Sequence, residues 1–143
     1  MKLYIAGPMT GVPQFNVPLF DRVADELRAQ KYDVVSPAEL DSPEMRAAAM
    51  QSADGALAPL EKATKETWGQ VLARDVRVLS DQGIEGIVLL PGWERSRGAN
   101  LEATVGLLNG LKFFLYDGDF LSPVGSRFVL TGIQTGFYER GQI

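Results

Sequence analysis

The acidic and hydroxyl side chains that lie next to apolar runs are the first candidates for chemistry in this sequence. Glu102 closes the segment LLPGWERSRGANLE, in which an apolar run stops at Pro-Gly and a helix is expected to start after Gly98. Asp75 lies beside the apolar stripe of another expected helix, and Tyr4 lies within the first apolar run. Carboxylates and hydroxyls in such places can act as nucleophiles, acids or bases.

The chain has 143 residues and contains no histidine and no cysteine. This composition excludes a Ser-His-Asp triad, a thiolate nucleophile, disulfides, and histidine or cysteine metal sites. Any catalysis must therefore use carboxylates, hydroxyls, lysine or backbone amides. The formal net charge of −4 argues against nucleic acid as the main partner.

Glu102 is expected in about the first turn of its helix, where the helix dipole favours the ionised carboxylate by about 0.3–1 kcal/mol. Burial would raise its pKa, but a rise of about two units from ~4.3 still leaves the group mostly ionised at neutral pH. Glu102 is therefore suited to be a nucleophile, with Ser96 and the neighbouring amides holding an anion beside it. The alternative is a glutamate that only stabilises the start of the helix.

Alternatives also exist for the other two candidates. The spacing of Asp75 favours an ion pair with Arg74 or Arg77 over a side chain that points into a site. Tyr4 is by default an aromatic residue of the core, although a hydroxyl near the end of a strand can reach a ligand.

Apolar runs alternate with segments of helical periodicity along most of the chain. We expect buried strands at residues 2–7, 32–37, 85–92 and 111–118. We expect helices from Asn16, which would cap the first of them, to residue 28, at residues 65–81, and from Gly98 to residue 108. This order predicts an α/β protein, with one domain over residues 1–143 and a doubly wound, Rossmann- or flavodoxin-like parallel sheet of four to five strands.

Two segments are harder to interpret. Residues 41–64 are rich in alanine and broken by Gly55 and Pro59, so we expect a short helix plus a loop, as a surface excursion rather than a lid. The last 25 or so residues hold a possible strand, RFVLTGI, and no clear helix. The first apolar segment is too short for a signal peptide, and no apolar run approaches the ~18 residues of a membrane helix, so we expect a cytoplasmic protein without a membrane partner.

Ligands of open parallel sheets bind beyond the carboxyl ends of the strands. The loops AGPMTG and PGWERSRG follow the first and third expected strands, are rich in glycine, and precede helices. The N-termini of helices favour phosphate or carboxylate groups. Neither loop is a GxGxxG or Walker A sequence, which argues against a dinucleotide fold or an NTPase.

The segments LYIAGPMTG, ARDVRVLSD and GIVLLPGWERSRGANLEA together resemble the nucleoside 2-deoxyribosyltransferase superfamily. The resemblance is to its small phage and bacterial members and to the nucleoside 5′-monophosphate N-glycosidases, and it covers roughly residues 1–116 except 41–64. It implies an enzyme that cleaves the N-glycosidic bond of a (deoxy)nucleoside or its 5′-monophosphate, by hydrolysis or by transfer to another base, without a metal or cofactor. Retaining glycosidases use a similar mechanism, in which two carboxyl groups about 5–5.5 Å apart flank an oxocarbenium-like transition state.

The resemblance also implies roles for individual residues. It makes Glu102 the nucleophile that attacks C1′ of the sugar, Asp75 the acid that positions the sugar or helps the base to leave, and Tyr4 a residue near the nucleophile. The residues that it implies for substrate or phosphate binding are Gly7, Pro8, Met9, Thr10, Ser96, Gly98 and, from the C-terminal part of a neighbouring subunit, Thr131 or Ser126.

The resemblance leaves the phosphate contact, the partners and a rival function open. Thr10 stands where the monophosphate hydrolases often carry an arginine, which Arg95 or Arg97 could replace. The expected partner is a small nucleotide or nucleoside, and the resemblance alone implies a homo-oligomer, a dimer or higher, with a shared active site. The rival function is nucleotide binding without catalysis, as in a sensor or sponge. Cytokinin-activating phosphoribohydrolases are a weaker alternative, because their PGGxGT signature is absent.

Overall fold

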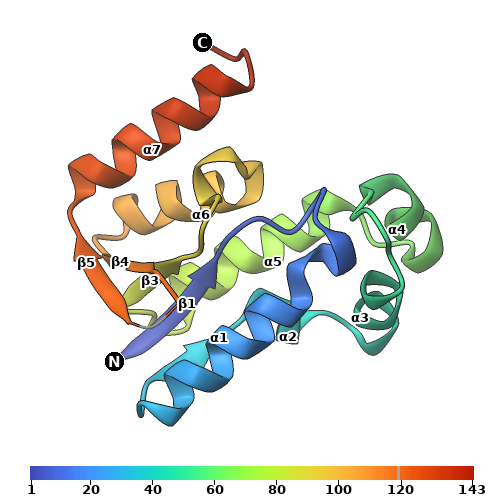
Figure 1. The fold of residues 1–143 in the computed structure, drawn as a ribbon, viewed down its shortest axis with the longest axis horizontal. Helices are drawn as coiled ribbons and strands as arrows, with labels where there is room; N and C mark the ends of the chain where they lie inside the picture. The colour runs from blue at the N-terminus through green and yellow to red at the C-terminus, as the bar shows by residue number, and fades with distance from the viewer. Residues whose placement is uncertain (119) are drawn as a thin grey trace.

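The computed structural model describes residues 1–118 and 120–143 and confirms the α/β class (Figure 1). The described residues form a five-stranded sheet of β1 (Lys2–Ala6), β2 (Asp33–Val35), β3 (Gly86–Leu89), β4 (Lys112–Tyr116) and β5 (Leu121–Val124). The strand order is β2-β1-β3-β4-β5. Strands β1 to β4 run parallel to one another, and β5 runs antiparallel to β4. This is the strand order of flavodoxin-like doubly wound sheets.

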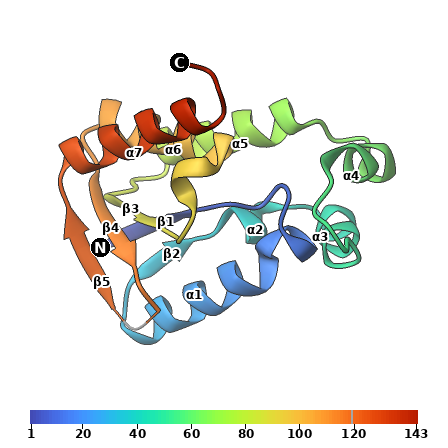
Figure 2. The same cartoon turned by 45° about the horizontal axis from the view of Figure 1, so that its top comes forward.

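Helices cover both faces of the sheet and lie beyond one of its ends. They are α1 (Val17–Ala29), α2 (Pro37–Leu40), α3 (Pro43–Met50), α4 (Leu57–Thr64), α5 (Trp68–Asp81), α6 (Arg97–Leu108) and α7 (Ser126–Glu139), with short 3-10 turns η1 (Pro13–Asn16) and η2 (Trp93–Arg95). Helix α1 lies against one face, whereas α5, α6 and α7 lie on the other side, and α3 and α4 lie beyond the carboxyl end of β1 (Figure 2). Within the described part of the chain, every helix is too short or too polar to span a bilayer.

Alternate side chains of β1 belong to two separate cores, one on each face of the sheet. Leu3 and Ile5 pack with the buried stripe of α1 that the helical spacing predicted. Tyr4 and Ala6 belong to the opposite core, which buries apolar side chains of β3, α5, α6 and α7. Because the central strands are buried on both faces, they read in the sequence as continuous apolar runs.

The C-terminal segment is a helix, so the strand expected at RFVLTGI is wrong. Helix α7 turns Val129, Gly132, Ile133 and Gly136 toward the protein at helical spacing. The outward side of α7 is also apolar, since it exposes Phe128, Leu130, Phe137 and Tyr138. Apolar residues therefore occur on both sides of the helix, and the sequence shows no helical period. The fifth strand is the preceding segment LSPV, whose short length and proline hide it from pattern analysis. Since β5 is antiparallel, the sheet is mostly rather than fully parallel.

Two other expectations need correction. Residues 41–64 form the two helices α3 and α4 instead of a short helix plus a loop, and Ser42 Oγ caps α3 by accepting a hydrogen bond from the Met45 amide at 3.1 Å. Asn16 occupies the N-cap position of α1, but its side chain donates to the Pro8 carbonyl at 2.9 Å instead of capping the helix. Asn16 therefore fastens the loop that follows β1. The other predicted strands and helices are confirmed, with ends shifted by a few residues.

Gly55 fastens the segment between α3 and α4 to the loop after β1, because its carbonyl accepts a hydrogen bond from the Gly11 amide at 2.8 Å. Its φ is +68°, and a Cβ there would lie 2.2 Å from the Val12 carbonyl oxygen. We expect Gly55→Ala to lower the free energy of unfolding, measured by urea denaturation, by roughly 2–5 kcal/mol through left-handed strain and overlap. Gly83→Ala is the matched control, since φ is also +68° but nothing lies within 4 Å of a Cβ. Equal losses in the two variants would contradict the close contact at Gly55.

Candidate functional site

A cavity of about 290 Å³ opens at the carboxyl ends of β1 and β3. Gly7, Met9 and Thr10 line it from the loop after β1, and Arg95 and Ser96 line it from the loop after β3. These two strands are neighbours at the point where the strand order reverses, which is where doubly wound sheets bind ligands. The volume is close to the lower end of the range of ~300–1,000 Å³ for ligand pockets and suits one small molecule.

Glu102 and Tyr4 form a buried hydrogen-bonded pair beside this cavity. The Tyr4 hydroxyl donates to Glu102 Oε1 at 2.7 Å. Tyr4 comes from the middle of β1 and is fully buried, whereas Glu102 is 5% exposed and lines the cavity from the second turn of α6. Tyr4 is thus both a core aromatic residue and the partner of the candidate nucleophile. Glu102 is not at the start of the helix, so the interpretation as a glutamate that only stabilises the first turn is wrong.

Burial controls the protonation of Glu102. Removal of the carboxylate from water raises the pKa of Glu102 well above its usual value, and the negative charge of Asp75 raises it further. The hydrogen bond from Tyr4 and the positive charge of Arg74 act in the opposite direction and favour the ionised form. Because the dipole effect falls off within the first turn of a helix, burial replaces it as the main influence on this residue.

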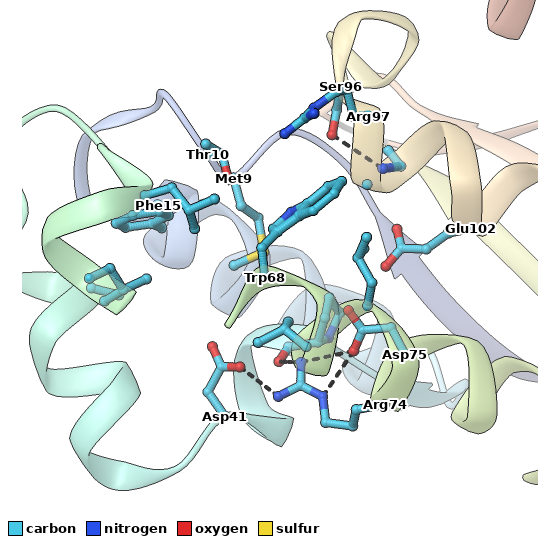
Figure 3. Close-up of a pocket in the computed structure, with 18 of the residues that line it drawn as sticks. Met9, Thr10, Phe15, Asp41, Trp68, Arg74, Asp75, Ser96, Arg97 and Glu102 are labelled. Atoms are coloured by element: carbon cyan, nitrogen blue, oxygen red, sulfur yellow. Dashed lines mark hydrogen bonds and ion pairs between the residues drawn. The ribbon is translucent and has the colours of Figure 1, made fainter. Parts of the chain in front are cut away.

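Asp75 belongs to a network of side chains around a single guanidinium. Arg74 donates to Asp75 Oδ1 through Nε at 3.0 Å and Nη2 at 2.8 Å, and to Asp41 Oδ1 through Nη1 at 2.7 Å. The ion pair between Arg74 and Asp75 confirms the pairing favoured by the spacing. Figure 3 shows that the Asp75 and Glu102 carboxylates nevertheless point into the same part of the cavity, from α5 and α6 respectively.

Asp75 keeps a raised pKa despite its ion pair. It is 4% exposed, and burial raises its pKa to about 6, while the adjacent Arg74 lowers it. Burial similarly raises the pKa of Asp41. Buried acids with raised pKa values are typical of catalytic carboxylate pairs, in which one acid is protonated and the other ionised.

Positive side chains surround the start of α6. Ser96 is the N-cap of this helix, with Oγ accepting a hydrogen bond from the Ala99 amide at 3.2 Å, so its own hydroxyl hydrogen is available to a ligand. Arg95, Arg97 and Arg140 line the same end of the cavity. This arrangement of arginines, a serine hydroxyl and a helix N-terminus is suited to a phosphate or carboxylate group.

The opposite wall of the cavity is apolar and comes mainly from the segment that the sequence left least defined. Helices α3 and α4 contribute four aliphatic or thioether side chains, namely Met45, Ala49, Leu57 and Leu60. Phe15 and Met9 complete this wall from the loop after β1 (Figure 3). Residues 41–64 are therefore a structural wall of the cavity, and the expectation of a surface excursion is wrong.

The structure brings most of the predicted site residues to this cavity. Its lining includes Gly7, Met9, Thr10, Asp75, Ser96, Gly98 and Glu102, and Tyr4 reaches it through Glu102. Pro8 is not part of the lining, and its carbonyl instead accepts the hydrogen bond from Asn16. Thr131 is exposed on α7 and lines a second hollow next to Trp93, so its role in the site of a neighbouring subunit stays a prediction.

Several residues that line the cavity were not candidates in the sequence. Trp68 has an apolar helical spacing, but it lines the cavity and stacks on Arg97, whose Cζ lies 4.3 Å from the ring centre. Asp41 and Arg140 lie in the two segments without a clear pattern, so nothing local distinguishes them from surface residues. In residues 1–118 and 120–143, no group of three or more acidic side chains is placed to hold a metal ion.

Comparison with known proteins gives a match to one family model. Residues 1–64 match the family described as Domain of unknown function (DUF4406). This stretch contains Tyr4, the loop after β1 and Asp41, but ends before Asp75, Ser96 and Glu102. No curated protein and no solved structure matches the chain.

The raised pKa of Asp75 makes a prediction about stability. In the folded protein Asp75 keeps its proton up to about pH 6. In the unfolded chain the same carboxyl group loses its proton near its ordinary pKa of 3.8. Between these values the folded state binds more protons, so the free energy of unfolding falls as the pH rises. Asp75→Asn removes this titration, and we expect the variant to gain up to about 3 kcal/mol relative to the parent between pH 4 and pH 7.

Urea denaturation at several pH values would measure this difference. Asp81→Asn, at an exposed position at the end of the same helix, serves as the control and should follow the pH profile of the parent. A constant difference between Asp75→Asn and the parent across this range would show that Asp75 ionises normally in the folded protein.

Proposed function

We propose that this protein cleaves the N-glycosidic bond of a (deoxy)nucleoside 5′-monophosphate or nucleoside, with Glu102 as the nucleophile. The observation that carries the proposal is the buried Tyr4–Glu102 pair, which faces Asp75 in one cavity. The resemblance of the motifs that contain these residues to the nucleoside 2-deoxyribosyltransferase superfamily supports the same chemistry. Cleavage of this bond needs a carboxylate beneath C1′ and a proton for the departing base, and the cavity offers both groups.

The two ends of the cavity suit the two ends of a nucleotide. A 5′-phosphate would bind at the end formed by Ser96, Arg95 and Arg97. A nucleobase would lie against the apolar wall that includes Phe15 and Met9, where a flat, largely apolar ring buries its faces. The cavity volume of about 290 Å³ fits one such molecule.

The first step transfers the sugar to the protein. Glu102 Oε1 accepts the Tyr4 hydrogen bond, so Oε2 attacks C1′ as a carboxylate. The bond between C1′ and the base nitrogen breaks, its electron pair goes to the base, and the protonated form of Asp75 gives its proton to the base. The reactive form of the free protein has its proton on Asp75 and its negative charge on Glu102. Burial and the charge of an ionised Asp75 oppose ionisation of Glu102, whereas the hydrogen bond from Tyr4 and the charge of Arg74 favour it, so this reactive form is a minority of the free protein.

The second step releases the sugar. Asp75, now ionised, takes a proton from water or from a second base, and the resulting nucleophile attacks C1′. The bond between C1′ and Oε2 breaks and restores the Glu102 carboxylate. Water gives hydrolysis, whereas a second base gives transfer, so the identity of the acceptor separates a hydrolase from a transferase.

We also propose that the protein works in the cytoplasm as a homo-oligomer, a dimer or higher, with an active site shared between subunits. Support for association comes from the outward side of α7, where Phe128, Leu130, Phe137 and Tyr138 are exposed. The proposal includes Thr131 as a contribution to the site of the neighbouring subunit.

Replacement of the proposed nucleophile provides the direct test. The parent protein is incubated with the common ribo- and deoxynucleoside 5′-monophosphates and nucleosides, and free base is measured by chromatography. We expect Glu102→Gln to reduce base release by about a thousandfold or more, because the amide has no charge with which to attack C1′. An added second base would show whether the sugar is transferred.

The control variant is Glu44→Gln, which changes an exposed glutamate in the first turn of α3 and should release base at the parent rate. The proposal fails if the parent releases no base from any compound, or if Glu102→Gln is as fast as the parent. Thermal stabilisation by a nucleotide without any free base would favour the non-catalytic nucleotide-binding protein instead.

A further inference from the structure

Helix α7 packs its backbone directly onto the loop that leads into α6. A Cβ at Gly136 would lie 1.8 Å from the Glu94 carbonyl oxygen, and a Cβ at Gly132 would lie 2.4 Å from the Trp93 ring. The two glycines are one helical turn apart, so they form a continuous contact strip along α7. The C-terminal helix therefore touches the η2 loop at a distance that only glycine permits.

Asn100 and Arg140 connect the same loop to both helices through side-chain hydrogen bonds. Asn100, which is 4% exposed in α6, donates through Nδ2 to the carbonyls of Trp93 at 3.0 Å and Glu94 at 3.1 Å. Its Oδ1 accepts a hydrogen bond from Arg140 Nη2 at 3.0 Å. Arg140 Nη1 donates to the carbonyls of Glu94 at 3.4 Å and Arg95 at 3.2 Å.

These contacts hold three successive carbonyl groups, those of residues 93, 94 and 95, immediately before the cap residue Ser96. The backbone of this loop sets the direction of the Arg95 side chain and the position of Ser96, and both residues line the cavity. Arg140 lines the cavity as well, although four of its hydrogen bonds already go to protein groups. Its main effect on a ligand is therefore exerted through the loop.

We propose that Arg140 is a positioning residue that sets the selectivity of the site for a 5′-phosphate, and that α7 of the same chain thereby completes the phosphate end of the cavity. The inference rests on the proposed function for the identity of the ligand. A guanidinium can satisfy the Asn100 oxygen and two carbonyls at once because its donors are fixed in a plane, whereas a lysine ammonium cannot reach acceptors in the same fork geometry. The geometry of the fork, rather than the positive charge alone, is what the loop requires.

The test measures binding instead of turnover. Dissociation constants are determined by calorimetry, in the Glu102→Gln background, for the four common deoxynucleoside 5′-monophosphates and the four matching nucleosides. We expect Arg140→Gln and Arg140→Lys each to weaken monophosphate binding by about tenfold or more, with less than about a twofold effect on the nucleosides. Arg127→Gln, on an exposed position of the same helix, should bind both classes as the parent does.

Gly136→Ala gives a second route to the same loop. Its added methyl group would displace α7 from the Glu94 carbonyl while Arg140 keeps its charge, so the same selective loss of monophosphate binding is expected. Hydrogen exchange provides a readout that needs no ligand, since the amides of residues 93–98 should exchange faster in Arg140→Gln than in Arg127→Gln.

Four results would overturn the inference. They are normal monophosphate binding by Arg140→Lys, equal losses of affinity for monophosphates and nucleosides, unchanged hydrogen exchange at residues 93–98, and a parent that binds none of the monophosphates. If monophosphates bind with the expected dependence on Arg140 but the parent releases no base, the proposed reaction fails while the positioning role of Arg140 stands.

Discussion

The hydrogen bond from the Tyr4 hydroxyl to Glu102 is the interaction on which the site depends. It joins strand β1 to helix α6 across 98 positions of the sequence. A carboxyl group that is 5% exposed would be costly to bury without a partner, and Tyr4 supplies one from inside the core. Burial and the nearby acids raise the pKa of Tyr4 well above its usual value, so the hydroxyl remains a neutral donor. The position of Glu102 in the cavity is therefore maintained by the packing of the sheet itself.

The acids around this pair share a limited supply of positive charge. Asp41 and Asp75 both bind the guanidinium of Arg74, so two carboxylates compete for one cation. Burial raises the pKa of all three acids in the cluster, Glu102 included, so each keeps its proton to a higher pH than it would in water. Because the buried carboxylates have too little positive charge beside them, the free energy of unfolding falls as the pH rises. The same surroundings provide an acid and a carboxylate in one cavity, as the proposed N-glycosidic cleavage would require.

Three segments that are distant in the sequence meet around these acids. The sheet supplies Tyr4 and the loops at its switch point, residues 41–64 supply the apolar wall, and α7 secures the loop before α6 from the other side (Figures 1 and 2). Each segment adds a different property to the cavity, namely a hydrogen bond to Glu102, an apolar surface and a fixed backbone. A change far from Glu102, such as one at Gly136, can therefore alter the site without touching the acids.

The sequence by itself determined the α/β class, the four parallel strands, and helices α1, α5 and α6, because strands buried on both faces need long apolar runs and one-sided helices keep a helical period. It also offered Tyr4, Asp75 and Glu102 as candidates beside apolar runs, although their spacing alone favoured structural roles and only the family resemblance assigned them to a site. It did not indicate α7, whose outward side is apolar, or Arg140 and Asp41, whose contacts join distant segments. Only the tertiary structure decided which acids have raised pKa values, because desolvation depends on burial in three dimensions, whereas the expected effect of the helix dipole depends on local position alone.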